Sequence, residues 1–169
     1  RFAAIFVDAQ PYAGEMLVLA LGIPAAGEKR LLGLRQGATE NATVVTSLLE
    51  QLRERGVRTD VPTLFVLDGA KALHAAVIRV WGKFAVSQRC QVHKRRNVEA
   101  HLSEEHHEEL GQRLSAAYHE TNATQALTLL RATVKWLRRI RPAAAASLEE
   151  GLEETLTIVR LGVPELLRK

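Results

Sequence analysis

The sequence predicts an α/β fold, in which three antiparallel strands precede a β-α-β unit and a wholly helical C-terminal region. Three observations support this prediction. Short runs rich in Val, Ile, Leu and Phe, separated by turns that contain Gly or Pro, fill the beginning of the chain. The apolar spacing then changes to that of helices, with two further strand-like runs between them. After residue 92 only helical spacing remains.

The first three strands form a predicted meander. Each is a run of apolar residues, and the links between them are short and contain Pro and Gly. Strands joined by such short links pair in antiparallel fashion. The expected strands cover residues 2–8, 15–24 and 29–35.

The middle of the chain alternates helices with strands. Gly56 and Gly82 end the two predicted helices, and Pro62 introduces the strand between them. The expected elements are a helix over 39–55, a strand over 63–67, a helix over 70–81 and a strand over 85–90.

The remaining residues are expected to form helices alone, over 94–102, 104–119, 123–140 and 143–169. We therefore divide the chain into a sheet-containing core, residues 1–92, and a helical region, residues 93–169. The order β-β-β-α-β-α-β, followed by helices, is the ribonuclease-H-like arrangement. In that arrangement the first and fourth strands are neighbours at the centre of the sheet.

Two of the predicted strands end on an aspartate, Asp8 after the first and Asp68 after the fourth. If these strands are neighbours, the two carboxylates meet at one edge of the sheet. Paired carboxylates bind hard cations such as Mg²⁺ or Mn²⁺, and a two-metal site usually needs a third acidic ligand. Each Asp could instead cap the turn or helix that follows it. The pair in this strand order favours metal binding.

Cys90 and His93 have a spacing that also occurs in zinc sites. Zinc needs four ligands in tetrahedral geometry, and the nearest histidines offer no convincing second pair. A single cysteine at the end of a strand is most often simply buried. We therefore favour a structural or site-adjacent role for both residues over zinc binding.

Positive charge is concentrated directly after His93, in Lys94, Arg95 and Arg96. Basic side chains near a helix start can contact phosphate, and a solvated charged face is the alternative. The position beside the expected metal site favours phosphate contact. Three further groups have bland expected roles. A surface cluster is expected for Arg138, Arg139 and Arg141, and an exposed helix face for Glu149, Glu150, Glu153 and Glu154. Trp81 and Trp136 are expected to anchor the core.

The composition narrows the class of protein. A net charge of +4 and a pI near 9.6 favour a polyanionic partner. One cysteine fits a reducing compartment, and no apolar run is long enough to span a membrane. The chain opens on Arg1 and closes on Lys169 without an obvious stop signal, so we expect a fragment of a longer protein.

Five stretches together resemble the Mutator-type transposases of bacterial insertion sequences. The most specific is the Cys-x-x-His motif that follows the second aspartate, because Asp-Gly alone is a weak signal. The resemblance covers nearly the whole chain. The stretches are residues 32–41 (LGLRQGATEN), 66–73 (VLDGAKAL), 88–98 (QRCQVHKRRNV), 147–157 (SLEEGLEETLT) and 160–169 (RLGVPELLRK).

The resemblance implies a DDE transposase with a ribonuclease-H-like catalytic core and a helical insertion. Asp8 and Asp68 match the first two catalytic carboxylates, although Ala9 follows Asp8 where the family pattern has Gly. Cys90 and His93 match the signature near the active site. The third carboxylate is expected beyond Lys169, in an Asn-Pro-Ile-Glu-like segment.

For the complete protein, the resemblance implies DNA cleavage and strand transfer that depend on Mg²⁺ or Mn²⁺. The expected partners are the ends of the insertion sequence, target DNA and further copies of the protein; a membrane is not expected. The expected location is the bacterial cytoplasm. This fragment by itself is expected to be inactive.

Two other functions remain open from the sequence. One is an inactive transposase remnant that only binds DNA or an intact transposase. The other is a structure-specific nuclease of the same fold, which would need a glutamate from residues 149–154 to reach Asp8 and Asp68.

Overall fold

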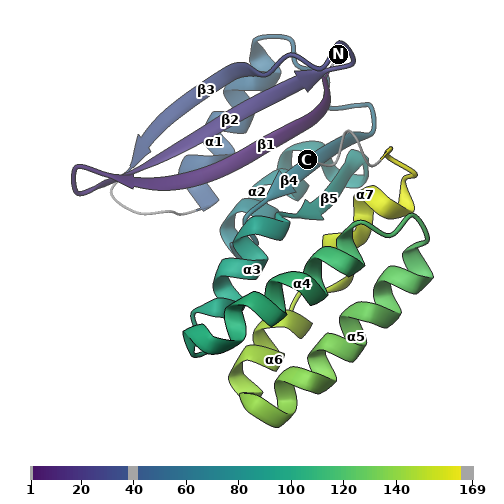
Figure 1. The fold of residues 1–169 in the computed structure, drawn as a ribbon. Helices are drawn as coiled ribbons and strands as arrows, with labels where there is room; N and C mark the ends of the chain where they lie inside the picture. Colours follow the sequence, from purple (N-terminus) through teal and green to yellow (C-terminus); the bar gives the residue numbers. More distant parts are fainter. Residues whose placement is uncertain (1, 38–41, 165–169) are drawn as a thin grey trace. The chain divides into compact units, whose positions relative to one another are not determined.

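The computed structural model describes residues 2–37 and 42–164. The chain divides into two compact units, Arg1–Ser87 and Gln88–Lys169 (Figure 1). The division falls within the last strand. Each unit has its own cluster of buried apolar side chains.

A five-stranded mixed sheet forms the centre of the first unit, in the order β3-β2-β1-β4-β5. β1 pairs antiparallel with β2 and parallel with β4, and β2 pairs antiparallel with β3. This confirms the α/β class, the antiparallel meander and the adjacency of the first and fourth strands. The strands are β1 (Phe2–Tyr12), β2 (Glu15–Pro24), β3 (Arg30–Gly37), β4 (Thr63–Leu67) and β5 (Ala85–Arg89).

β1 is longer than the sequence predicts, because the hairpin turn is tighter than expected. The strand continues to Tyr12, and only Ala13 and Gly14 form the turn. Both have positive φ, 50° and 82°. Two-residue turns of this kind match the twist of the strands that they join.

Two helices, α1 (Ala42–Glu54) and α2 (Lys71–Trp81), pack against one face of this sheet (Figure 1). Alternate residues of the strands point to that face, since side chains alternate along a strand. Trp81 is buried as expected, with its ring centroid 4.9 Å from that of Phe65. Residues buried between sheet and helices include Ile5, Val7, Val18, Leu48, Leu49, Phe65 and Val77.

The second unit is a bundle of helices around a leucine-rich core. Asn122 begins the longest helix by accepting hydrogen bonds from the backbone N–H groups of Thr124 and Gln125, at 2.9 and 3.1 Å. Trp136 is only half-buried, and the guanidinium of Arg113 lies 4.7 Å from the centre of its ring. The helices are α3 (Gln91–Glu99), α4 (His107–Tyr118), α5 (Ala123–Ile140), α6 (Pro142–Glu149) and α7 (Thr157–Arg160), with 3₁₀ turns at Glu104–His106 and Glu153–Leu156.

The prediction of one long helix over 143–169 is wrong. α6 ends at Glu149, and Gly151 turns the chain with φ of 63°. Only a 3₁₀ turn and the short α7 follow, and residues 165–169 lie outside the described part. The glutamates of residues 149–154 therefore do not share one helix face, although all four are exposed.

In the described part of the chain, no helix is both long and apolar enough to cross a membrane.

Candidate functional site

The first unit places Asp68 directly after β4 and Asp8 within β1, its parallel neighbour. The prediction that Asp8 ends its strand is wrong, because β1 continues to Tyr12 and pairs with β2 over that length. The pairing between β1 and β4 runs from Ala4 with Leu64 to Val7 with Leu67. Asp8 and Asp68 are the next residue on each strand. Both are half-buried. The pairing therefore brings into register two carboxylates that are 60 positions apart in the sequence, at the point where β4 ends.

Each carboxylate also makes local hydrogen bonds. Asp8 accepts from the backbone N–H of Ala9 at 3.0 Å and from the side-chain amide of Gln10 at 2.7 Å. Asp68 accepts from the backbone N–H of Ala70 at 2.7 Å. A carboxylate has about four lone-pair sites, so these bonds leave room for a further ligand.

Asp68 orders the turn that leads from β4 to α2. Gly69 has φ of 102°, a conformation that side chains disfavour, which explains the Asp-Gly pair. The N-cap residue of α2 is Ala70, which makes no side-chain cap. Asp68 therefore stabilises the turn and does not cap the helix. Capping of the following turn was one of the roles considered for it from the sequence.

The donor set at this edge suits hard cations, because carboxylate oxygens are the ligands that Mg²⁺ and Mn²⁺ prefer. Over residues 2–37 and 42–164, no three His, Cys, Asp or Glu side chains gather in a way that could hold a metal. The described part thus supplies two carboxylates for such a site.

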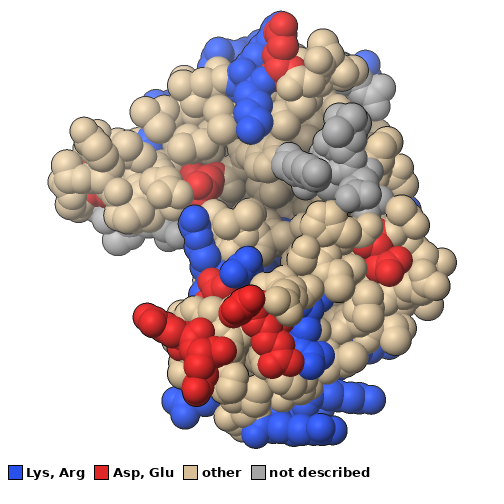
Figure 2. Space-filling model, viewed as in Figure 1, with Lys and Arg blue, Asp and Glu red and all other residues tan. Residues whose placement is uncertain are grey.

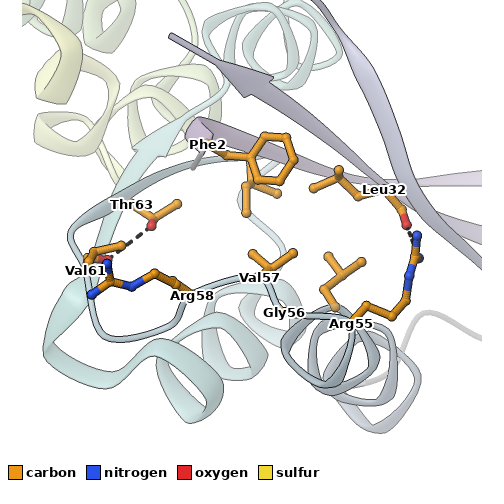
Figure 3. A pocket seen from close by; sticks show the side chains of 10 residues that line it. Phe2, Leu32, Arg55, Gly56, Val57, Arg58, Val61 and Thr63 are labelled. Carbon is orange, nitrogen blue, oxygen red and sulfur yellow. Dashed lines mark hydrogen bonds between the residues drawn. The ribbon is translucent and has the colours of Figure 1, made fainter.

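A separate depression of about 360 Å³ lies near the opposite ends of these strands (Figure 3). It is lined by Phe2 of β1 and by Thr63, the first residue of β4. The guanidinium of Arg55 points to the carbonyl oxygen of Leu32, at 2.6 Å, and that of Arg58 pairs with Asp60. Its cations are thus bonded to other groups of the protein.

Cys90 and His93 lie at the start of α3 in the second unit. Cys90 is the N-cap residue, half-buried and not in a disulfide, and His93 is one turn further on. Tyr118 is a neighbour of Cys90, and burial raises the pKa of its hydroxyl to about 12. The helix begins three residues earlier than predicted. Consequently, the backbone N–H of Lys94 already bonds to the carbonyl of Cys90, at 3.0 Å, and is not exposed to anions.

Lys94 differs from the expected phosphate contact because its side chain is fully buried. The ammonium donates to the carbonyl oxygens of Ser147 and Glu150, at 2.7 and 2.5 Å, and lies 3.4 Å from a carboxylate oxygen of Glu150. These carbonyls belong to the end of α6, where helix carbonyls need partners. Burial lowers the pKa of Lys94. Lys94 thus caps α6 and presents no charge on the surface.

Arg89, which is also buried, completes this group of polar side chains around the exposed Glu150, which the sequence did not indicate. Its guanidinium binds both carboxylate oxygens of Glu150, at 3.1 and 2.7 Å. The hydrogen bond from Arg89 lowers the pKa of Glu150. We call Arg89, Lys94 and Glu150 the α6 clamp. No sequence pattern links Glu150 to two cations more than fifty positions earlier.

Gln88 forms a second connection in the same unit. Its amide nitrogen donates to the carbonyl of Thr155 at 2.8 Å, and its amide oxygen accepts from the N–H of Ile158 at 2.9 Å. Gln91 donates to the same Thr155 carbonyl, at 2.9 Å. Polar residues on both sides of Cys90 therefore hold the segment that follows α6.

The other cations predicted to contact phosphate remain on the surface of α3. Arg95 and Arg96 are exposed, and Arg95 forms an ion pair of 2.6 Å with Glu99 on the same helix. Of this basic triplet, Arg96 alone is both exposed and without a carboxylate partner among the described residues.

The glutamates near the break also pair within the second unit. Glu149 pairs with Arg138, and Glu153 lies 3.0 Å from Arg160 and 3.7 Å from Arg131. Three of the four acidic residues in this run, counting Glu150, therefore neutralise cations nearby.

Comparisons with known proteins agree with these motifs. Residues 6–165 match the family model described as "Transposase, Mutator family". A transposase for insertion sequence ISRM5 of Rhizobium meliloti is 31% identical over 87% of this chain, and the match covers 36% of that protein. A transposase for IS1201 of Lactobacillus helveticus is 27% identical over 80% of the chain, which covers 38% of that protein.

A third relative, a transposase for IST2 of Acidithiobacillus ferrooxidans, is 29% identical over 83% of the chain and is covered over 47% of its length. The chain thus spans less than half the length of each of these relatives. The family match nevertheless extends over almost all of the sequence. The chain belongs to the Mutator family of transposases.

Proposed function

We propose that this chain is part of the catalytic domain of a DDE transposase with a ribonuclease-H-like core. The complete protein would cut DNA at the ends of an insertion sequence and join the freed ends to target DNA. Asp8 and Asp68 are two of its three catalytic carboxylates in this proposal.

One observation supports the proposal most directly, the parallel pairing of β1 and β4. Val7 pairs with Leu67, and Asp8 and Asp68 are the residues that follow this pair, which supports a shared site for the two carboxylates. Strand order supports the ribonuclease-H-like assignment as well, since three antiparallel strands are followed by a strand that pairs parallel with the first. Family membership links this arrangement to transposition.

The two aspartates are proposed ligands of Mg²⁺ or Mn²⁺. Bound there, such an ion would lower the pKa of water and offset charge on a phosphate. Gln10 and the N–H groups of Ala9 and Ala70 orient the carboxylates through the hydrogen bonds described above. Fixed orientation matters because ligand positions set the geometry in which DNA can react.

The remaining parts of the proposal concern the complete protein. The third carboxylate would lie outside these 169 residues, in sequence that the longer relatives possess. Cys90 and His93 are proposed neighbours of the active site, because they form the Cys-x-x-His motif that carries much of the resemblance. DNA ends, target DNA and further copies of the protein are its proposed partners.

The proposal is tested by Asp68→Asn in the full-length protein that contains this chain. Loss of one carboxylate removes a metal ligand while leaving the side chain's size unchanged. Since even outer-shell partners of metals contribute about 10- to 100-fold, we expect Mn²⁺-dependent cleavage of a plasmid carrying the element to fall by more than about 100-fold.

Asp60→Asn is the matched control for this experiment. Asp60 is an exposed aspartate of the same unit that pairs with Arg58, and its loss should leave cleavage unchanged. Cleavage by Asp68→Asn at the rate of the Asp60 variant would contradict the catalytic assignment. For the nuclease alternative, three of the four candidate glutamates, Glu149, Glu150 and Glu153, already pair with cations, which leaves Glu154 as its candidate.

A further inference from the structure

The long helix α5 bears a row of basic residues on its exposed side. Arg131, Lys135 and Arg138 follow one another at spacings of four and three, which places them on one face of the helix. Arg139 is the next residue and lies four positions after Lys135. Arg141 comes directly after the helix. All five are exposed. In Figure 2, basic side chains gather at the end of the molecule where α5 meets α6.

Only part of this row is neutralised by nearby acids. Arg138 pairs with Glu149, and Arg131 lies 3.7 Å from Glu153. Lys135, Arg139 and Arg141 have no carboxylate partner among the described residues. We call these last three residues the α5 basic surface.

This surface differs from the basic triplet of α3, which the sequence favoured. Lys94 is buried in the α6 clamp, and Arg95 is held by Glu99. Three cations without acidic partners at the end of α5 therefore offer a stronger anion-binding surface than Arg96 by itself.

The burial of the apolar side of α5 indicates whether the anion is a membrane surface or a nucleic acid. Its apolar side chains, which include Leu130, Val134 and Leu137, are buried in the core of the unit. A helix that binds a membrane surface needs an apolar face free to enter the lipid, and α5 has none. Exposed Lys and Arg without such a face suit the phosphate backbone of a nucleic acid.

We propose that Lys135, Arg139 and Arg141 form a contact surface for the phosphate backbone of duplex DNA, independent of base sequence. The inference rests on the proposed function in one respect, that DNA is the partner. Reading of bases requires side chains held in a fixed bidentate geometry, and no neighbouring acid holds these three. Contact with phosphates requires only charge and reach.

The test is the triple variant Lys135→Gln, Arg139→Gln, Arg141→Gln in the 169-residue chain. Binding to two 30-base-pair duplexes of unrelated sequence is measured by fluorescence anisotropy over a range of salt concentrations. Each lost phosphate contact lowers the slope of log affinity against log salt by about 0.9. We expect a slope smaller by about 2 to 3, and equal losses on both duplexes.

A matched control removes the same charge from the first unit, as Lys29→Gln, Arg53→Gln, Arg79→Gln. These residues are also exposed. The proposal requires that this control retain the affinity and salt slope of the unmodified chain. Equal losses in both triple variants would show an effect of net charge alone and would overturn the proposal, as would failure of the unmodified chain to bind either duplex.

A further arm separates the remaining explanations. Vesicles of phosphatidylserine and phosphatidylcholine should bind neither the chain nor its variants. If the unmodified chain binds vesicles and the α5 triple variant does not, while both bind DNA equally, the surface binds a membrane instead. The metal-site proposal is tested by cleavage and this one by binding, so the two can fail separately. An α5 variant with normal DNA binding would therefore refute this surface and leave the metal-site proposal standing.

Discussion

Lys94 shows how the surroundings of one side chain decide its role. A lysine is rarely fully buried unless its charge is paired, and here two carbonyls and a carboxylate surround the ammonium. Desolvation of the charge is costly, so the fold depends on these partners remaining in place. The residue stabilises the end of α6 instead of binding a ligand.

Lys94→Met should therefore destabilise the second unit. Methionine fills similar space but leaves the carbonyls of Ser147 and Glu150 without their buried donor. A buried acceptor left without its donor costs about 1 to 3 kcal/mol, so we expect a loss in that range. Urea unfolding followed by circular dichroism measures the change in the free energy of unfolding.

Lys135→Met is the control, because Lys135 is exposed and no partner holds it; its effect should stay within about 0.5 kcal/mol. Equal unfolding midpoints for the two variants would show that the buried ammonium does not stabilise the fold.

The sequence predicted the two aspartates but not the burial of Lys94. The neighbouring positions of Asp8 and Asp68 could be predicted because strand order determines which strands pair, although Asp8 lies within β1 and not at its end. The position of Lys94 depends on Ser147 and Glu150, which lie 53 and 56 positions later. A basic triplet in sequence contains no information about such distant partners.

At the scale of the elements, the turn at Gly151 that ends α6 is determined by the backbone conformation of this residue and by its close contact with Arg89. Gly151 has φ of 63°, and a Cβ atom there would lie 2.8 Å from a guanidinium nitrogen of Arg89. Gly151→Ala should thus strain the backbone and also push Arg89 away from Glu150. We expect a loss of more than about 1 kcal/mol in the free energy of unfolding.

Gly162→Ala separates the two effects in the same thermal or urea measurement. Gly162 has nearly the same φ, 66°, and nothing lies within 4 Å of a Cβ placed there. The free energy of unfolding of Gly162→Ala should fall only by the cost of the strained backbone conformation. If the two alanine variants are equally stable, the contact with Arg89 does not matter.

Most elements could be predicted from local patterns because local forces determine them. The hairpin strands have period-two burial, and α5 has an asparagine cap followed by apolar residues at helical spacing. The prediction of one long helix over 143–169 was wrong because it rested on Leu and Glu, which favour helices locally. The break at Gly151 instead depends on Arg89 and Lys94, which lie far away in sequence.

At the scale of the whole molecule, metal binding and stability are linked through the proposed site. A ligand that binds only the folded protein raises its apparent stability, by about 2.7 kcal/mol at 100 times its dissociation constant. Under the proposed function, Mn²⁺ should raise the melting temperature of the full-length protein. Asp8→Asn should abolish that increase, as measured by differential scanning calorimetry.

Asp60→Asn again provides the comparison, since it removes an exposed carboxylate from the same unit. Its melting temperature should respond to Mn²⁺ as the unmodified protein does. An identical response in the Asp8 variant would mean that manganese binds elsewhere.

The hydrogen bonds of Gln88 join the beginning of the second unit to residues 67 and 70 positions further along the chain. These bonds fix two segments that are far apart in the sequence to each other, so the chain between them forms a closed loop. The helices between those segments can therefore grow, shrink or be exchanged while the attachment points keep their positions.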